Sequence, residues 1–437
     1  MPGIQRTGNK HYDIAVLGDS LAGRLTATLA AKKGCHVLSV HNNKELQVPW
    51  LTSSHLLERI LGLLDGRSCS TKPFPFQVIT KNQRINFNDS NPLTDELRRE
   101  LPEESEEIAT FLDDMSALGE NLEELLWEHH GFPTTGLGNR LKFKKICFSS
   151  DVPSRAFRQT LRDRVAVFNT PGARKLLSAL FCGFAFKPSN KLTLAECALV
   201  WGGLGHKSGV VKNGLEELLW HRYRQFHGEE EALFRLARVR DDKSGLTTLV
   251  FENGETVTCD HLVFADREKI ALCEGIAPPQ TGRITSSHLS VNLMDRISPL
   301  LHQNVIVDGN PPLRLNFEKS DTVTRCRVEN AAISDGGLSS PEKIETRLQK
   351  IIPFVDLDLT PLAQSPHSDM TISSEENPVL MSAYEKIVFD HGRKFLCSGS
   401  EVIPELGSVG EVLVAITVTG QLLKATGNPP LQQKAEK

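Results

Sequence analysis

The sequence predicts an α/β protein in which one parallel-sheet domain is interleaved with a second, mixed α+β domain. Three observations predict this class. A strand, a glycine turn, a helix and a second strand open the chain at 12–40, a helix followed by strands occupies 214–265, and a strand and a long apolar helix close it at 394–425. Strands that alternate with helices indicate a parallel sheet covered by helices. Helical and mixed segments separate the three parts, so the sheet domain is expected to be discontinuous.

The composition is that of a globular protein with two or three domains. The chain has 437 residues, of which 39% are hydrophobic and 24% charged, and its formal net charge is −4. This charge gives no overall positive field that would attract nucleic acid, so no nucleic-acid partner is expected. No apolar run approaches the roughly 20 residues of a membrane span, and no signal-peptide core precedes the first strand. We therefore expect a cytoplasmic protein and leave peripheral membrane contact open.

The nine cysteines are scattered and form no C-x-x-C pair. Zinc ribbons and thioredoxin-type sites depend on such pairs, so the sequence predicts neither, and we assign no metal ligand. Because several cysteines lie within apolar runs, buried free thiols in a reducing compartment are the favoured interpretation.

The first segment has the pattern of a Rossmann-like βαβ unit that binds a dinucleotide. The strand YDIAVLG is followed by the turn Gly18-Asp19-Ser20-Leu21-Ala22-Gly23, a helix, and the strand HVLSV. Gly18 would permit the tight turn, and Gly23 would let the helix approach the strand. The helix N-terminus would offer unpaired amides to an anionic diphosphate. Ser20 stands where the middle glycine of the motif belongs, and His41 stands where an acid usually holds the ribose.

The middle of the chain predicts helices and one hairpin. Helical spacing at 54–64 has Ser53 or Ser54 as its N-cap, and residues 75–88 alternate as two strands about a turn at 81–83. An acidic helical stretch is broken at Pro102, and further helices follow at 154–200. Phe181, Phe184 and Phe186 either pack as core or line a lipophilic pocket, and core is favoured.

The second half predicts strands, a hairpin about Asn253-Gly254, and a terminal helix at 410–425. These patterns divide the chain into a dinucleotide-binding domain, a substrate or cap domain, and a disordered tail. The dinucleotide-binding domain comprises 10–75, 208–283 and 366–426, the cap domain 76–207 and 284–365, and the tail 427–437.

The order of these elements resembles the FAD-dependent oxidoreductases of the phytoene desaturase, amine oxidase and protoporphyrinogen oxidase superfamily. The resemblance rests on the N-terminal βαβ unit, the block from GVVKNGLEELLW to VTCDHLVFAD, and the segment FLCSGSEVIPELGSVGEVLVAITVTGQLL. It implies a flavoprotein that passes a hydride from an apolar or amine-type small molecule to FAD, with Leu236 at the adenine. No catalytic residue follows from it. The cofactor-binding residues that it implies are Gly18, Asp19, Ser20, Ala22, Gly23, His41, Leu236, Gly399, Ser400, Glu401, Val409 and Gly410.

Four departures from the family pattern fall on the residues that would contact FAD. The first is Ser20, with Asp19 beside it placing a carboxylate near the diphosphate, and the second is His41. The third is that residues 42–61 contain no glycine for the family's second glycine loop, and the fourth is that Ser400 replaces an aspartate. Glu401 would substitute for that aspartate if the register slips by one residue. At about 1–1.5 kcal/mol for each lost contact, binding would weaken by about two to four orders of magnitude.

Two alternatives therefore stand beside the flavoenzyme interpretation. The same fold is that of the Rab GDP-dissociation inhibitors, which bind protein and prenyl groups without using a flavin, so the chain would then be a non-catalytic scaffold or assembly protein with a protein partner. The other alternative places NAD(P) at the N-terminal turn, with Asn42, Asn43 and Lys44 near a 2′-phosphate.

Overall fold

The structure is a computed structural model, and it describes most of the chain between residues 10 and 431. The residues in this range that it does not describe are 43, 47, 49, 67–70, 88–91, 135–136, 206–207, 243–244, 274–282, 294–300, 311, 320–323, 332–340, 353–357, 362–368 and 373–378. The predicted domain boundary at 366 falls on these residues and lies outside the described structure, whereas the boundary at 283/284 falls at the start of the strand Arg283–Leu293.

The first sheet brings together the three segments that the sequence singled out. Its strands follow the order β17-β18-β10-β1-β2-β7, with the hairpin partner β9 on β10 and β8 on β9. β1 pairs in parallel with both β10 and β2, and its last five residues are nearly all fully buried, as expected of a central parallel strand. The strands are β1 (Lys10–Leu17), β2 (Val37–His41), β7 (Glu229–Ala232), β8 (Leu236–Asp241), β9 (Thr247–Phe251), β10 (Thr256–Phe264), β17 (Val388–Phe389) and β18 (Lys394–Leu396).

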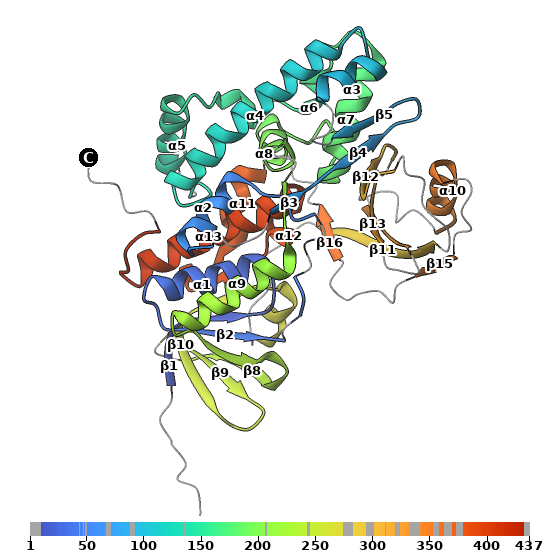
Figure 1. The fold of residues 1–437 in the computed structure, drawn as a ribbon. Coiled ribbons are helices and arrows are strands. Elements are labelled where there is room, and N and C mark those ends of the chain that lie inside the picture. Colours follow the sequence, from blue (N-terminus) through green and yellow to red (C-terminus); the bar gives the residue numbers. More distant parts are fainter. Residues whose placement is uncertain are drawn as a thin grey trace, which may run out of the picture.

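Three helices cover one face of this sheet, and they position the site described below. α1 (Leu21–Lys32) packs against both α9 (Lys212–Gln225) and α13 (Gly407–Ala425), as Figure 1 shows. The buried residues of α1 include four alanines and two threonines between its leucines. The small alanine side chains allow the neighbouring helices to approach closely. α13 is long and apolar enough to cross a membrane, but 83% of its apolar window is buried inside the protein. It therefore has the environment of a core helix.

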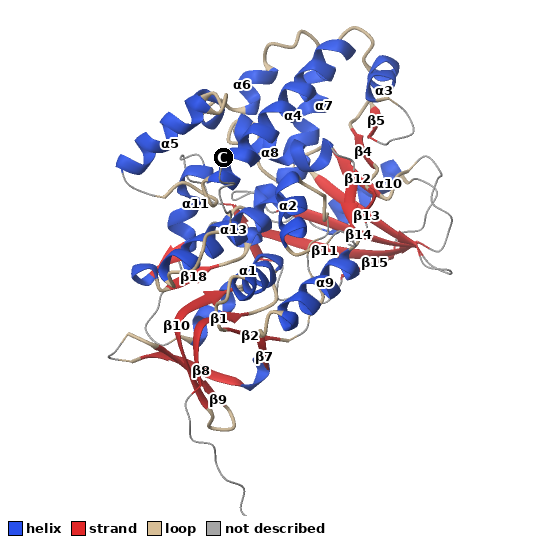
Figure 2. Cartoon of the chain, turned by 60° about the vertical axis from the view of Figure 1, so that its left-hand side comes forward, coloured by secondary structure: helices blue, strands red, loops and turns tan. Residues whose placement is uncertain are grey.

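The second sheet has the order β15-β11-β14-β13-β12-β4-β5, with β16 on β11, and it is antiparallel except where β4 and β12 pair. The hairpin predicted at 75–88 forms its edge. Figure 2 shows this sheet beside the first, under a layer of helices. Its strands are β4 (Phe76–Ile79), β5 (Arg84–Phe87), β11 (Arg283–Leu293), β12 (Asn304–Val307), β13 (Leu313–Lys319), β14 (Thr324–Ala331), β15 (Asp358–Pro361) and β16 (Asp369–Ile372); β3 (Thr71–Pro73) and β6 (Ser208–Val210) pair separately.

A helical layer lies over both sheets. Pro102 separates its first two helices, as predicted, and Pro171 is the first residue of the helix Pro171–Ala185. Phe181, Phe184 and Phe186 are 0–3% exposed, which confirms them as core. The layer consists of α3 (Leu93–Glu100), α4 (Ser105–Glu128), α5 (Leu137–Ser149), α6 (Leu161–Val165), α7 (Pro171–Ala185) and α8 (Leu194–Gly205); α2 (His55–Leu63) lies below it, α10 (Pro341–Ile351) accompanies the second sheet, and α11 (Val379–Ile387) and α12 (Gly399–Val402) precede α13.

Some boundaries differ from the sequence prediction. α13 begins at Gly407, three residues before the predicted start at Gly410, because the turn Pro404–Leu406 leads directly into the helix.

The disordered tail predicted at 427–437 was placed too early. The Asn428 amide donates to Cys35 Sγ, Lys33 Nζ donates to the Pro430 carbonyl, and Leu431 is 2% exposed, so the chain stays packed through 431. Residues 432–437 lie outside the described structure.

Buried glutamates cap several helices in this fold. Ser54 is the N-cap of α2, as predicted, and Glu123 from α4 accepts a second hydrogen bond there from the Leu56 amide at 2.9 Å. Glu196 caps its own helix α8 through the Thr193 amide at 2.7 Å and also pairs with Lys187, which bonds Glu405 at 3.2 Å. The Lys187 ammonium therefore ties the helical layer to the turn before α13.

The cap formed by Glu123 predicts a pH dependence of stability. Burial raises the pKa of Glu123 from 4.5 to about 7, and its Oε1 has no hydrogen-bond partner. The folded protein therefore keeps this proton to higher pH than the unfolded chain, and stability falls as pH rises from about 4.5 to about 7. Glu123→Gln should remove this loss, at most about 3 kcal/mol, in urea unfolding measured across that range. Glu124→Gln, an exposed neighbour, is the matched control, and a Glu123→Gln curve parallel to wild type would contradict the assignment.

Candidate functional site

The candidate site lies where β1 enters α1. Gly18 has φ +115°, which glycine adopts without strain, and a Cβ there would lie 3.0 Å from Asp266 Cβ. A Cβ on Gly23 would lie 2.3 Å from Ala265 Cβ, at the end of β10. The two glycines thus hold the geometry that the sequence pattern predicts, a tight turn followed by a helix pressed on the sheet.

Ser20 is the N-cap of α1. Its Oγ accepts a hydrogen bond from the Gly23 amide at 3.0 Å and donates one to the Cys397 carbonyl at 2.7 Å. The residue in the place of the motif's middle glycine therefore closes the helix end and links it to the segment after β18.

The side chain of Glu411 accepts a hydrogen bond from another amide of the first turn of α1, that of Ala22. Its Oε2 accepts from the Ala22 amide at 3.0 Å, and its Oε1 accepts from the Ser400 amide at 2.8 Å. Ala22 lies in the first turn of α1 and Ser400 in α12, so one carboxylate joins two helix N-termini from a third helix, α13. A Cβ on Gly399 would lie 2.3 Å from the Glu411 amide, which explains the glycine at this close approach. The protein's own anion thus takes the place that a helix N-terminus offers to a bound one.

This end of α1 is lined with acids. Glu411 is 4% exposed, and burial raises its pKa, while the amides that it accepts from oppose the shift. Glu401 turns away and accepts from the Arg267 amide at 3.1 Å; burial raises its pKa to about 8, and the nearby charges of Asp266 and Glu411 add to the rise. Asp19 is a further acid of the same turn. At neutral pH Glu401 is therefore mostly protonated, and Asp19, which pairs with Arg24 at 3.4 Å, is the acid whose carboxylate would lie beside a diphosphate.

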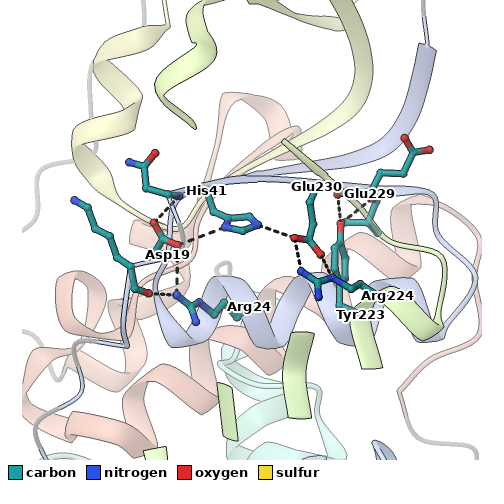
Figure 3. A network of polar contacts seen from close by, with 10 residues as sticks. Asp19, Arg24, His41, Tyr223, Arg224, Glu229 and Glu230 are labelled. Carbon is teal, nitrogen blue, oxygen red and sulfur yellow. Dashed lines mark hydrogen bonds and ion pairs between the residues drawn. The ribbon is translucent and has the colours of Figure 1, made fainter. Parts of the chain in front are cut away.

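His41, at the end of β2, belongs to a buried network (Figure 3). Its ring stacks on Trp220 of α9 with centroids 4.3 Å apart, and its nitrogens lie 3.9 Å from Asp19 Oδ1 and 3.5 Å from Glu230 Oε2. Arg24 of α1 is 5% exposed, lies 3.4 Å from Asp19 Oδ1, and has its guanidinium 5.2 Å from the centre of the Trp220 ring. The position of the ribose-binding acid is therefore taken by an imidazole that the protein's own side chains hold.

A carboxylate is present near the end of β2, but it comes from the neighbouring strand. Glu230 of β7 binds His41 and Arg224, and hydrogen bonds from these two groups lower its pKa to about 2. It is therefore ionised and satisfied within the protein. Trp220, Arg24 and Glu230 were not predicted as site residues, because their roles arise only when α9 and β7 fold against β2.

Of the other predicted residues, four lie at or near the N-termini of α12 and α13, and Leu236 lies apart from them in β8. Gly399 and Ser400 meet α1 through Glu411, and Val409 and Gly410 are buried in the first turns of α13. Leu236 begins β8 and is 6% exposed, whereas Ala232 of β7 is the residue paired with His41. In place of a second glycine loop, the segment after β2 brings Thr52 to Ser408, with the two hydroxyl oxygens 2.9 Å apart.

These contacts decide whether the residues fit FAD. A diphosphate at this turn would need amides of the first turn of α1, and those of Ala22 and Gly23 are bonded to Glu411 and Ser20. The ribose position is filled by His41, and the Asp19 carboxylate lies beside the position of another anion. The residues as folded do not fit the group, so no step through FAD is derived.

Among the described residues, no cluster of three or more histidine, cysteine or acidic side chains could hold a metal ion.

The His41 network predicts that an acid at this position is destabilising. His41→Glu would place a carboxylate between Asp19 and Glu230, so it should lower stability by at least about 2 kcal/mol more than the neutral His41→Gln. Urea unfolding at neutral pH, followed by tryptophan fluorescence, measures the difference, which should narrow in acid as the carboxylates are protonated. Equal stabilities of the two variants at neutral pH would contradict the arrangement.

Comparisons with known proteins identify the fold. No family model and no curated protein matches the chain. Among solved structures, it is similar to cyclohexylamine oxidase from Brevibacterium oxydans IH-35A (TM-score 0.57, 11% identity, 95% of this chain and 99% of that one). It is also similar to a CLA-producing fatty acid isomerase from P. acnes (0.58, 11%, 95% and 98%) and to Rab GDI from Plasmodium falciparum (0.51, 11%, 89% and 93%). The chain therefore has the fold that this amine oxidase, the fatty acid isomerase and Rab GDI share.

Proposed function

We propose that this chain is a non-catalytic member of the flavoprotein fold, which binds a protein partner and does not transfer hydride. The observation that carries the proposal is the Glu411 carboxylate on the amides of Ala22 and Ser400. Fold alone does not decide function, so the argument rests on this site. The fold is also that of Rab GDI, to which the chain is similar.

Glu411 competes with a diphosphate on favourable terms. It belongs to the same chain, so binding it to the amides costs no translational entropy, whereas a free cofactor must lose that entropy. To admit a diphosphate, the protein would have to release the two hydrogen bonds that Glu411 accepts and place negative charge beside Asp19. These costs add to those of the contacts missing at His41 and Ser400.

The second candidate is a FAD-dependent oxidoreductase that takes a hydride from an apolar or amine-type small molecule. The close approach of α1 to the sheet at Gly18 and Gly23 favours it, because that geometry is what a dinucleotide requires. In this candidate Glu411 would turn away from Ala22 when the cofactor binds.

Flavin content separates the two candidates. Purified wild-type protein should be colourless, and excess FAD should leave no absorbance at about 450 nm after dialysis. Protein that stays yellow through dialysis and oxidises an amine would overturn the proposal in favour of the second candidate.

Substitution of Glu411 tests the reason for the expected result. Glu411→Ala frees the amides of Ala22 and Ser400, so the variant should bind ADP or FAD at least about tenfold more tightly than wild type in calorimetry. Glu401→Gln is the matched control, because Glu401 is a neighbouring acid that binds Arg267 and not α1. Circular dichroism establishes that each variant is folded. Equal affinities of Glu411→Ala and Glu401→Gln would show that Glu411 does not block the amides.

A further inference from the structure

The helix α5 presents apolar side chains on two opposite faces. Phe143 and Cys147 are buried on one face, where the Phe143 ring packs edge-on against Phe157 at 5.6 Å. On the other face Phe148 is 89% exposed and Leu141 66% exposed, which makes them two of the four large exposed hydrophobic side chains in the described part of the chain. The inward face accounts for the helix's packing, and the outward face is left without a partner.

Lysines share the outward face with these apolar residues. Leu141, Lys144, Lys145 and Phe148 follow the spacing i, i+3, i+4, i+7, so they form one stripe, and Lys142 is exposed beside it. None of the three lysines forms an ion pair with a described residue. Residues 129–150 contain no aspartate or glutamate, although the whole chain has a net charge of −4. This positive charge is therefore local to α5.

The place of α5 leaves this stripe accessible. The helix lies at the outer edge of the helical layer in two views related by a 60° turn (Figures 1 and 2). Its main packing partner is the turn Ser154–Phe157, which lies on the buried side with Phe143.

We propose that the stripe Leu141, Lys144, Lys145 and Phe148, with Lys142, docks the protein on an anionic lipid surface. Lysines beside exposed aromatic and leucine side chains are the pattern of a helix that lies in the membrane interface: the ammonium groups bind anionic head groups, and the apolar side chains enter the acyl boundary. An acidic protein would complement the lysines but would need an apolar patch placed against Phe148 and Leu141, whereas a lipid surface offers head groups and acyl chains at every position. A second copy of this chain would bring the lysines against each other. The lipid surface satisfies both parts of the stripe.

Vesicle sedimentation of the full chain tests this docking. Wild-type protein should bind vesicles that contain phosphatidylglycerol, bind pure phosphatidylcholine vesicles weakly, and be released as salt screens the charges. Phe148→Ser should weaken the partition coefficient by about tenfold or more. Lys144→Glu with Lys145→Glu should abolish the preference for anionic vesicles.

Phe234→Ser is the matched control, because Phe234 is also strongly exposed, at 70%, but lies in the turn between β7 and β8. It should bind vesicles as wild type does. Failure of wild type to bind anionic vesicles, or equal losses in Phe148→Ser and Phe234→Ser, would overturn the proposal. A concentration-dependent dimer that Phe148→Ser dissolves, without vesicle binding, would assign the stripe to a second copy of the chain and overturn it too.

Discussion

The bond between the Glu411 carboxylate and the amides of Ala22 and Ser400 determines how the site is arranged. It joins α1, α12 and α13 at the one edge of the sheet where their N-termini converge. Each N-terminus carries a partial positive charge and unpaired amides, which would be costly to bury without an acceptor. One buried carboxylate meets this need for two of them. The close contact of Gly399 with the Glu411 backbone and the cap by Ser20 follow from the same packing.

The same physical device recurs elsewhere in the molecule. Glu123 crosses from α4 to the first turn of α2, as Glu411 crosses from α13 to α1. Both carboxylates are buried, and burial raises the pKa of both, because an amide hydrogen bond only partly replaces water around a charge. A helix end in this fold is thus closed by an acid from another helix. At α1, that closure occupies an amide that a helix N-terminus can offer to a bound anion.

Local patterns made the fold predictable, whereas the site depended on distant contacts. Gly18 and Gly23 could be interpreted because a tight turn and a close helix–strand approach act within a few residues. Ser54 as a cap and the hairpin at 75–88 were predictable for the same reason. Glu411 lies 389 residues from Ala22, and nothing near it in the sequence signals its partner. Trp220 and Glu230 likewise reach His41 only through tertiary packing. The helix α5 was missed because its apolar residues lie on two faces and give no single-face period.

A crystal structure of the protein grown with excess FAD tests the central claim most directly, because it shows which group lies on the α1 amides. The account predicts Glu411 oxygens at hydrogen-bond distance from the Ala22 and Ser400 amides, with His41 still stacked on Trp220. A diphosphate on the Ala22 amide, with Glu411 turned away, would contradict it.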